Sequence, residues 1–569
     1  MLPNEKYNQK CQDEFIKKCT SDSFVDGDNV FRSCHENFDT FKGSYLHEII
    51  WKDVDKWWDK TALVCSTTHR SYTYAQLRKL SGKFATSLRK LNIKPNETVA
   101  VILPNIPEFA IVTLGASEAG IRLTLVNSEF TSREIKNQLK NSETVAVVSV
   151  LIKHNVIIES INDVASIRHP PIYVNDEKHS QPSGTINFDD LIADCVQEFY
   201  KTGDKIGVNA MTDTAVLPYS SGTTGLPKGV EITHRNLVTN LAQFHHEDCK
   251  IIQPAVGNFQ EVIPLVLPLF HAYGFSVVLC PGLSNGAKMI LLSKFNSTDF
   301  LSLLDNNKST LFFLVPPIIQ LMINDDRFTK KHTNNLRQII TCASVISNKN
   351  IAKLRTKFGN EFIFSQGYGL TETTTVITIG NKNSPCTSVG RLMPNTLMKI
   401  IGRSDDNLGK CLGVDKIGEV LVKGSQVTKG YFKNPQATLD TIQDGWLKTG
   451  DLGSFDENEN LTLHGRIKEI IKVNGMQVSP TELELLFHQH DKISDVAVIG
   501  IPHERSGEIL KAFIVKKKGA VICENDVKKY LATRAARYKQ IEQVVFVDKI
   551  PKDAAGKILR KQLRYIDDT

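Results

Sequence analysis

The sequence predicts an α/β protein: a large N-terminal domain of mostly parallel, helix-covered sheets with a small β-rich subdomain, followed by a small α+β C-terminal domain. Three observations support this prediction. Between residues 98 and 150, apolar strands alternate with helices, which is typical of a parallel sheet covered by helices. After residue 385 the strands become shorter and glycines separate them. Residues 466–569 form a compact pattern of strands and a helix.

Length, charge and cysteine spacing limit the class of protein. A chain of 569 residues is too long for one hydrophobic core and long enough for two or more domains. The net charge of +7 is mild, and no basic tract is dense enough to predict nucleic-acid binding. The eleven cysteines show neither a CxxC pair nor a Cys/His cluster, so we expect neither zinc nor a disulfide framework. Free thiols favour a reducing compartment such as the cytoplasm.

The first half of the chain yields an extension, a helix and then alternating elements. Residues 1–44 are polar and without a clear period, so we expect a loosely held extension that lacks the apolar core of a signal peptide. Apolar residues at helical spacing from Leu46 to Trp58 predict a helix packed on the core. Thr131 and Glu134 form a capping box for a following helix. Strands are expected at 98–103, 121–126, 145–150 and 215–218, helices at 108–119 and 131–140, and irregular chain at 153–212.

The second half of the chain repeats the strand–helix alternation before the shorter, glycine-separated strands begin. The longest weakly charged stretch, residues 262–283, contains three prolines, so we expect a buried strand and helix rather than a membrane span. Strands are expected at 277–280, 289–292, 311–315, 338–342, 398–401, 418–422, 495–500, 511–515 and 543–547, and a helix at 525–537.

The stretch Tyr219–Gly229 carries the strongest chemical signal in the sequence. It reads YSSGTTGLPKG, with glycines for close backbone approach and hydroxyls and a lysine for a polyphosphate. It is not the common P-loop, because Lys228 is followed by Gly229 and the glycine spacing is shorter. A flexible surface hairpin is the alternative, and the density of hydroxyls disfavours it.

Ordered motifs give this stretch a family context. The loop resembles the phosphate loop of the adenylate-forming (AMP-binding) superfamily, with its acyl-CoA synthetase, 4-coumarate–CoA ligase, beetle luciferase and peptide-synthetase branches. Further motifs follow in the family's order, over about residues 45–565: PLFHAYG at 268–274, QGYGLTE at 366–372, TGD at 449–451, GRIKE at 465–469 and PKDAAGKILR at 551–560. The resemblance implies an N-terminal adenylation domain at 45–465 and a mobile C-terminal domain at 466–569, with a hinge near Lys468.

The resemblance also implies which residues bind ATP and Mg²⁺. Tyr368 would lie along adenine, Thr371 would bond the α-phosphate, and Glu372 would hold Mg²⁺. Asp451 and Arg466 would contact the ribose. The β- and γ-phosphates would be gripped by Ser220, Ser221, Gly222, Thr223, Thr224 and Lys228, and Ala343, Gln366 and Gly367 would complete the nucleotide site.

Two further residues are expected at the reacting carboxylate. His271 would contact the carboxylate and the α-phosphate. A histidine in so apolar a setting is, however, often only a core residue. Considered alone, Lys557 would be an exposed, solvated charge. The resemblance places it in the active site, where it would stabilise developing charge. The substrate residues would be His271, Tyr273, Cys342 and Thr375, and Cys342 stands where relatives have a glycine.

Rotation of the C-terminal domain would then bring a second face to the nucleotide and CoA. That face would carry Lys472, Asn474 and Gly475, and many CoA-using relatives have lysine where this chain has Asn474. Lys294 is a candidate contact for a CoA phosphate, and a plain surface charge is an equal alternative. The C-terminus is not a Ser-Lys-Leu-type address, so peroxisomal association is open but unsupported.

The resulting functional hypothesis is an acid–CoA ligase that uses ATP, Mg²⁺ and CoA on a medium- or long-chain fatty acid or an aryl acid. One alternative passes the acyl group to a carrier-protein thiol or to a luciferase-like oxygenation. Another is a catalytically inactive scaffold, which the retained Lys228, Glu372 and Lys557 disfavour. The sequence fixes neither the acid nor the oligomeric state, and it predicts no nucleic-acid partner.

Overall fold

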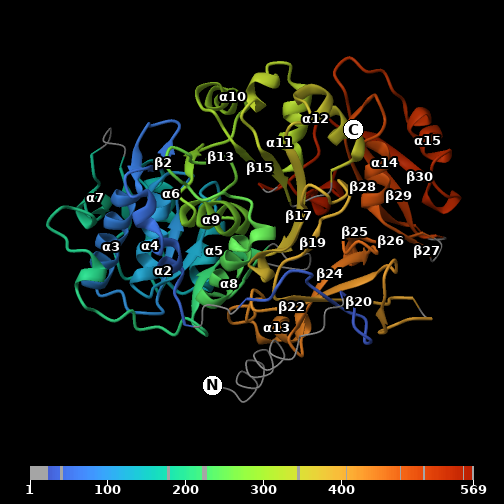
Figure 1. Cartoon of the computed structure of the whole chain (residues 1–569). Coiled ribbons are helices and arrows are strands. Elements are labelled where there is room, and N and C mark those ends of the chain that lie inside the picture. Colours follow the sequence, from blue (N-terminus) through green and yellow to red (C-terminus); the bar gives the residue numbers. More distant parts are fainter. Residues whose placement is uncertain are drawn as a thin grey trace.

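The computed structural model describes residues 24–38, 43–175, 180–220, 227–342, 346–404, 406–473, 476–503, 506–554 and 556–566. Three sheets with parallel strands form the larger part of the molecule, an antiparallel sheet lies beside them, and the C-terminal sheet lies at one side (Figure 1). The α/β prediction is therefore confirmed.

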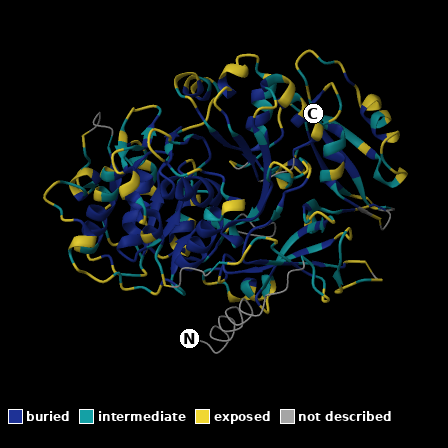
Figure 2. Cartoon of the chain, in the orientation of Figure 1, coloured by how far each residue is buried: buried dark blue, intermediate teal, exposed yellow. Residues whose placement is uncertain are grey.

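The first sheet has seven strands in the order β12-β9-β5-β4-β6-β7-β8, parallel except for β12. Its strands are β4 (Thr98–Ile102), β5 (Arg122–Leu125), β6 (Thr144–Val150), β7 (Ile172–Val174), β8 (Ile186–Asn187), β9 (Thr214–Leu217) and β12 (Ile232–Thr233). The four-stranded sheet contains β2 (Thr61–Cys65), β3 (Ser71–Thr73), β13 (Val262–Leu265) and β14 (Lys288–Leu291). These strands are mostly buried on both faces (Figure 2), as helix-covered parallel strands must be.

The five-stranded sheet is the one that positions the candidate site. Its strands are β15 (Leu311–Leu314), β16 (Gln338–Thr341), β17 (Ile363–Leu370), β18 (Thr375–Ile379) and β19 (Arg391–Leu392). The first three run parallel, and β18 then pairs antiparallel with β17 through a bulge at Tyr368 and Gly369. A bulge redirects the chain and its side chains, and it lies within the QGYGLTE motif.

Two more large sheets follow, besides a two-stranded ribbon. The antiparallel subdomain contains β1 (Val30–Arg32), β20 (Thr396–Ile401), β21 (Cys411–Leu412), β22 (Gly418–Gly424), β23 (Ile442–Gln443), β24 (Trp446–Phe455) and β25 (Leu461–Arg466). The C-terminal sheet contains β26 (Ile471–Val473), β27 (Met476–Val478), β28 (Ile493–His503), β29 (Gly507–Lys516) and β30 (Ile541–Phe546). Between them lies a short 3-10 turn, η8 (Ile467–Glu469), at the predicted hinge.

Helices cover the sheets as the alternation predicted. The large part carries α2 (Leu46–Trp51), α3 (Tyr74–Lys90), α4 (Glu108–Glu118), α5 (Ser132–Asn141), α6 (His154–Ile161), α7 (Phe188–Leu191), α8 (His234–His245), α9 (Cys280–Ser284), α10 (Ser297–Asn306), α11 (Pro316–Asn324), α12 (Asn348–Phe358) and α13 (Pro435–Thr441). The C-terminal part carries α14 (Pro480–Phe487), α15 (Glu524–Ala532) and α16 (Arg560–Leu563). The capping box of α5 at Thr131 and Glu134 is confirmed.

Every residue of α4 is buried, its two carboxylates included. Glu108 accepts a hydrogen bond from the Tyr72 hydroxyl at 2.9 Å, and Glu118 pairs with Arg78 at 2.8 Å. Buried charge is tolerated where it is paired, so this central helix can be enclosed on all sides.

The structure overturns three local predictions. Residues 277–280 are not a strand, because η5 (Tyr273–Leu279) is a π-helix that runs into α9; a short, continuously apolar run does not distinguish strand from helix. Residues 153–212, expected to be irregular, contain α6, α7, β7 and β8. The helix expected over 46–58 ends at Trp51, a 3-10 turn (Val54–Trp57) follows, and Trp58 is 43% exposed.

The expectation of a loosely held extension is wrong for residues 24–38. Strand β1 pairs antiparallel with β20, and Phe31 is fully buried. Its ring lies 5.3 Å from that of Phe24 and 4.5 Å from that of Phe455. This segment therefore belongs to the antiparallel subdomain.

Among the residues that the structure describes, none of the helices has the length and apolar character of a membrane span.

Replacing Phe31 by alanine should destabilise the protein by about 3–5 kcal/mol, the usual cost of emptying an aromatic site in a core. Urea unfolding of the full chain should show the lowered midpoint. Leu408→Ala is the matched control, because Leu408 is 65% exposed in the same subdomain. Equal midpoints for the two variants would contradict the packing of β1.

Candidate functional site

A cavity of about 210 Å³ lies where the C-terminal part meets the large part of the molecule. Strand β17, the β24–β25 pair, helices α11 and α14 and the C-terminal loop all contribute to its lining. Twelve of the lining residues belong to the predicted motifs: Gly367, Tyr368, Gly369, Asp451, Gly465, Arg466, Glu469, Lys552, Gly556, Lys557, Ile558 and Arg560. Motifs far apart in the sequence thus converge on one space.

The Asp451 carboxylate is held from two sides in this cavity. Asp451 and Arg466 are direct cross-strand partners on β24 and β25, and Arg466 Nε lies 3.0 Å from Asp451 Oδ1. The Tyr368 hydroxyl donates to Asp451 Oδ2 at 2.7 Å. Burial raises the pKa of the Asp451 carboxyl, and Arg466 and Tyr368 oppose that rise. Burial by itself would lower the pKa of the Arg466 guanidinium, but Asp451 and Tyr368 act in the opposite direction, and the pKa is raised.

Lys557 faces this group from the C-terminal loop. Its backbone N–H donates to Asp553 Oδ1 at 2.9 Å, which closes the turn that presents its side chain. Burial lowers the pKa of Lys557, and the neighbouring Arg466 lowers it further, while Glu469, Asp553 and Asp451 act in the opposite direction. A desolvated ammonium thus lies in the same cavity as Tyr368 and Asp451.

The two ends of the hydroxyl-rich loop are held by a short antiparallel ribbon. Strands β10 (Tyr219–Ser220) and β11 (Lys228–Gly229) pair so that Ser220 lies opposite Lys228. The intervening predictions, Ser221, Gly222, Thr223 and Thr224, lie outside the described residues.

Glu372 lies beside this ribbon. Its Oε1 accepts hydrogen bonds from the Ser220 hydroxyl at 3.0 Å and from the Tyr431 hydroxyl at 2.9 Å. Lys228 Nζ lies 5.0 Å from the centre of the Tyr431 ring, within range of a cation–π interaction. Glu372 and Lys228 therefore share one locality, as predicted. A carboxylate held at the end of this hydroxyl-rich loop fits the oxygen coordination that Mg²⁺ prefers.

His271 is half-buried, and a neighbouring backbone N–H fixes its tautomer. Burial lowers its pKa, with Asp553 opposing the shift. The Tyr273 N–H lies 3.1 Å from His271 Nδ1, so Nδ1 accepts and the ring proton sits on Nε2. The ring can therefore donate a hydrogen bond to an anionic oxygen but carries no charge itself.

Three other predicted substrate residues lie in the wall behind the site. The Tyr273 hydroxyl donates to the Ile340 carbonyl at 3.2 Å, and burial raises the pKa of the adjacent Cys342 thiol to about 12. Thr375 Oγ1 lies 2.6 Å from Ser276 Oγ. Thr375 has φ 98°, which a β-branched residue rarely adopts, and such strain is frequent beside functional sites.

Several predicted ligand residues do not line the cavity. The Gln366 side chain is buried and bonds the backbone of Ile346 and Cys386, so it has a structural use. Lys294 is 82% exposed and lies 3.5 Å from Glu129. Lys472 is exposed on β26, and Lys468 is exposed in η8. Ala343, Asn474 and Gly475 lie outside the described residues.

Comparison with known proteins settles the family. A family described as "AMP-binding enzyme" matches residues 50–432, and its C-terminal domain matches residues 482–557. The chain belongs to the AMP-binding enzyme family. Its relatives include 4-coumarate–CoA ligase 1 of Petroselinum crispum, 35% identical over 547 residues that cover 94% of this chain and 96% of that protein. Its counterpart in Arabidopsis thaliana is 35% identical over 538 residues, covering 91% and 92% of the two chains.

A solved structure agrees in fold. ATP-bound MatB from Rhodopseudomonas palustris superposes with a TM-score of 0.80 at 26% identity, covering 91% of this chain and 98% of that one. The present chain and MatB thus share the arrangement of a large N-terminal and a small C-terminal domain.

The sequence analysis missed two residues that organise this AMP-binding site. Tyr431 joins Glu372 to the loop ribbon, and only its place after a glycine in KGYF marked it in the sequence. Arg560 lies three residues after Lys557. It donates two hydrogen bonds to Glu484, one of them from Nη2 to Oε2 at 3.0 Å. It donates a third from Nε to Glu469 Oε2 at 3.0 Å. Burial disfavours its charge, yet the two carboxylates raise its pKa. Arg560 thereby fixes the Lys557 turn to α14 and to η8.

Replacing Arg560 by alanine should destabilise the C-terminal part by about 3–5 kcal/mol, because Glu484 and Glu469 would remain unpaired in a largely buried place. Urea unfolding combined with limited proteolysis should show earlier cleavage of that part. Arg564→Ala removes the same charge from an exposed position on the same segment and should change little. Matching losses in both variants would mean that the paired geometry contributes nothing.

Proposed function

We propose that this protein is an ATP-dependent acid–CoA ligase that forms an acyl-AMP and then an acyl-CoA. It is an enzyme of the AMP-forming acid–thiol ligase class and uses a carboxylic acid, ATP, Mg²⁺ and CoA. The observation that carries the proposal is the convergence of Tyr368, Asp451 and Arg466 with Lys557 on one cavity. The names of the relatives favour an aryl acid over a fatty acid as the substrate.

In this proposal the predicted site residues divide the nucleotide between them. Lys228 and Ser220, with Ser221, Gly222, Thr223 and Thr224, hold the β- and γ-phosphates. Glu372 would hold Mg²⁺, which would neutralise charge on the phosphate oxygens. Asp451 and Arg466 bind the ribose diol, and a carboxylate has lone pairs for this beyond the two contacts already made. Tyr368, Gly367 and Ala343 lie along adenine, and Thr371 bonds the α-phosphate.

The first half-reaction then needs alignment and charge stabilisation rather than a base. A carboxylate oxygen attacks the α-phosphorus, the bond to the bridging oxygen breaks, and pyrophosphate leaves with its electron pair. Lys557 lies in a desolvated place where its charge acts strongly on the developing negative charge. Neutral His271 donates its Nε2–H toward the same oxygens. Tyr273, Cys342 and Thr375 form the wall on the acyl side.

The second half-reaction needs the space that Lys557 occupies. We propose domains at 45–465 and 466–569 that rotate about Lys468, whose place in the short turn η8 suits a hinge. The CoA thiol then attacks the acyl carbonyl carbon and AMP leaves. The face with Lys472, Asn474 and Gly475 would meet the nucleotide after rotation, and Lys294 remains a candidate for the CoA phosphates. A cytoplasmic location suits the free cysteines of the described chain.

The deciding experiment is a panel of aryl and fatty acids, assayed with and without CoA. Acid-dependent exchange of pyrophosphate into ATP reports the adenylate, and mass spectrometry reports the thioester. We expect exchange with at least one aryl acid, and thioester only when CoA is added. Exchange without thioester would favour a carrier-protein or luciferase-like acceptor, and the absence of exchange with every acid would refute adenylation.

Replacing Lys557 by alanine should lower the rate of acyl-AMP formation by on the order of 10²- to 10³-fold, the range for one preorganised electrostatic contact. The exposed Lys561, four residues later, gives a matched Lys561→Ala control. A Lys557→Ala enzyme as fast as the control would refute this role.

The pH dependence of the same step should carry the signature of Lys557. Because its pKa is lowered, the charge is lost at a lower pH than for a free lysine, and kcat/KM for ATP should fall as pH rises through that value. Lys557→Arg should be slower but should lack this alkaline decline, since arginine stays protonated. An unchanged alkaline limb in Lys557→Arg would assign the titration to another group.

A further inference from the structure

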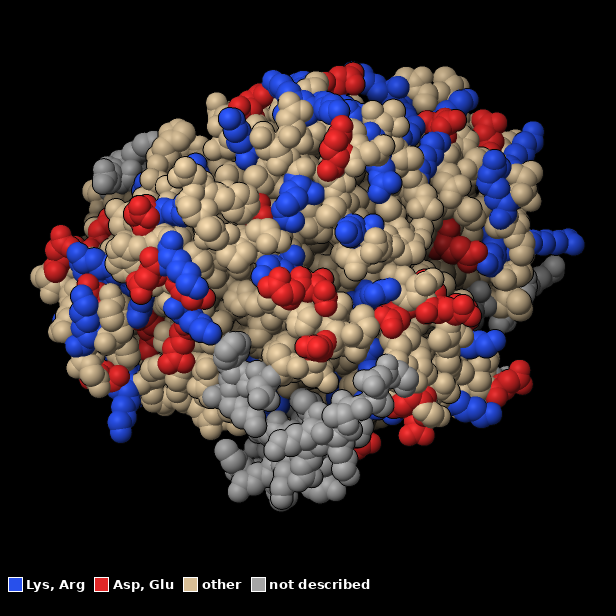
Figure 3. Space-filling view, in the orientation of Figure 1, with Lys and Arg blue, Asp and Glu red and all other residues tan. Residues whose placement is uncertain are grey.

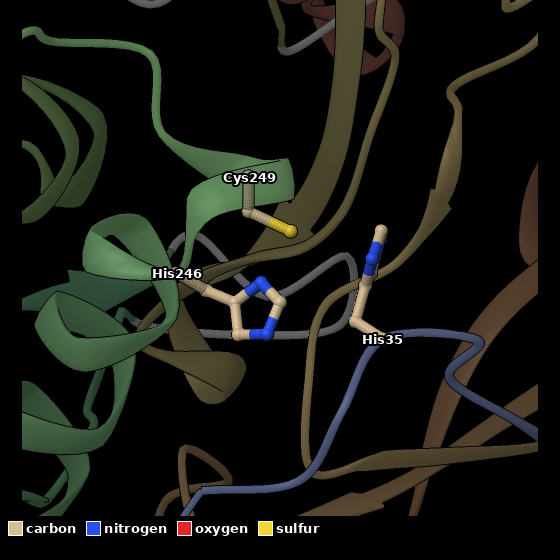
Figure 4. A group of neighbouring side chains, drawn as sticks. All are labelled: His35, His246 and Cys249. Atoms are coloured by element: carbon tan, nitrogen blue, oxygen red, sulfur yellow. The ribbon is translucent and has the colours of Figure 1, made fainter.

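Two histidines and a cysteine meet away from the nucleotide cavity. His35, His246 and Cys249 each offer a ligand atom, and these atoms all lie within 4.8 Å of one another. Figure 4 shows the two rings and the sulfur around a common space. His35 comes from the segment that follows β1, whereas His246 caps and Cys249 ends the short 3-10 turn after α8. None of the three lines the cavity around Asp451.

The sequence predicts no zinc site because it shows no Cys/His cluster, whereas the structure brings two histidines and a cysteine together. His246 and Cys249 are three positions apart, but His35 lies far away in the sequence and reaches them only through the pairing of β1 with β20. Spacing rules detect ligands that are near in sequence. The third ligand here is brought by tertiary structure.

The chemistry of the three groups selects the type of ion. Imidazole nitrogen and thiolate sulfur are ligands for Zn²⁺ and similar divalent ions, whereas Mg²⁺ prefers oxygen. With Zn–N of about 2.0–2.1 Å and Zn–S of about 2.3 Å, tetrahedral ligand atoms lie roughly 3.3–3.7 Å apart. A spread of at most 4.8 Å therefore closes onto an ion by side-chain movements of about 1 Å.

A carboxylate beside the group supports the same reading. Asp248 Oδ2 lies 3.2 Å from His35 Nδ1 and 3.9 Å from His246 Nδ1. Metal-binding histidines commonly bond a carboxylate through the other ring nitrogen, which fixes the ring. The hydrogen bond between His35 and Asp248 does not by itself require a metal. It does not explain, however, why the buried Cys249 thiol faces both rings.

We propose that His35, His246 and Cys249 bind a zinc-type divalent cation that fastens the N-terminal segment to the end of α8. The fourth position is left to water or to Asp248. The site is structural, and it is separate from Glu372, the residue assigned to Mg²⁺. Its existence does not depend on the acid–CoA ligase activity.

Co²⁺ titration of the chelator-treated full chain tests the site, because a cobalt–thiolate bond gives a charge-transfer band and tetrahedral Co²⁺ gives strong visible bands. We expect one equivalent of Co²⁺ to produce both and Zn²⁺ to abolish them. Cys249→Ser should lose the charge-transfer band, and His35→Asn and His246→Asn should each weaken binding more than about tenfold. The exposed Cys195 and His69 provide the controls, Cys195→Ser and His69→Asn, which should bind normally.

A second measurement keeps the test valid if Cys249→Ser folds poorly. Zn²⁺ should protect residues 24–38 of the wild-type chain from limited proteolysis, and His35→Asn, altered at a half-buried position, should lose this protection. The absence of a cobalt–thiolate band in the wild type would overturn the proposal. A band that survives Cys249→Ser, or that Cys195→Ser abolishes, would overturn it equally.

Discussion

The buried Asp451 carboxylate, held between the Arg466 guanidinium and the Tyr368 hydroxyl, is the interaction on which the rest of the site depends. A charge removed from water must be paired, so its partners have little freedom to move away. Arg466 is the last residue of β25 and directly precedes η8, while Tyr368 comes from a different sheet. One carboxylate therefore joins two sheets and fixes the chain at the point where the C-terminal part begins.

The C-terminal part is organised around a second set of buried charges. Arg560 bonds Glu484 and Glu469, and the turn that presents Lys557 lies immediately before it. Lys557 therefore reaches the cavity as part of a rigid unit rather than as a flexible side chain. In the proposed rotation, such a unit would be placed over the nucleotide or withdrawn from it by changes confined to a few residues of η8. Rigid parts joined by a short turn suit an enzyme with two successive half-reactions.

Local sequence signals predicted most of the fold and the motifs of the site. The capping box at Thr131 and the alternation over residues 98–150 specify their elements because neighbouring residues determine them. The signals failed where distant contacts decide. Residues 277–280 form a helical turn in a run that is apolar throughout, and β1 is a strand only because β20 offers it an edge. Tyr431 and Arg560 escaped notice for the same reason, since their partners lie elsewhere in the chain.

The central claim is that the hydroxyl-rich loop and the C-terminal lysine act on a single nucleotide. A crystal structure of the full chain with a non-hydrolysable acyl-AMP analogue and Mg²⁺ tests it most directly. The account predicts adenine along Tyr368 and the ribose at Asp451, with the Lys557 ammonium at the α-phosphate and carboxylate oxygens. An analogue bound in another cavity, or one bound here with Lys557 turned to solvent and Arg560 separated from Glu484, would contradict it.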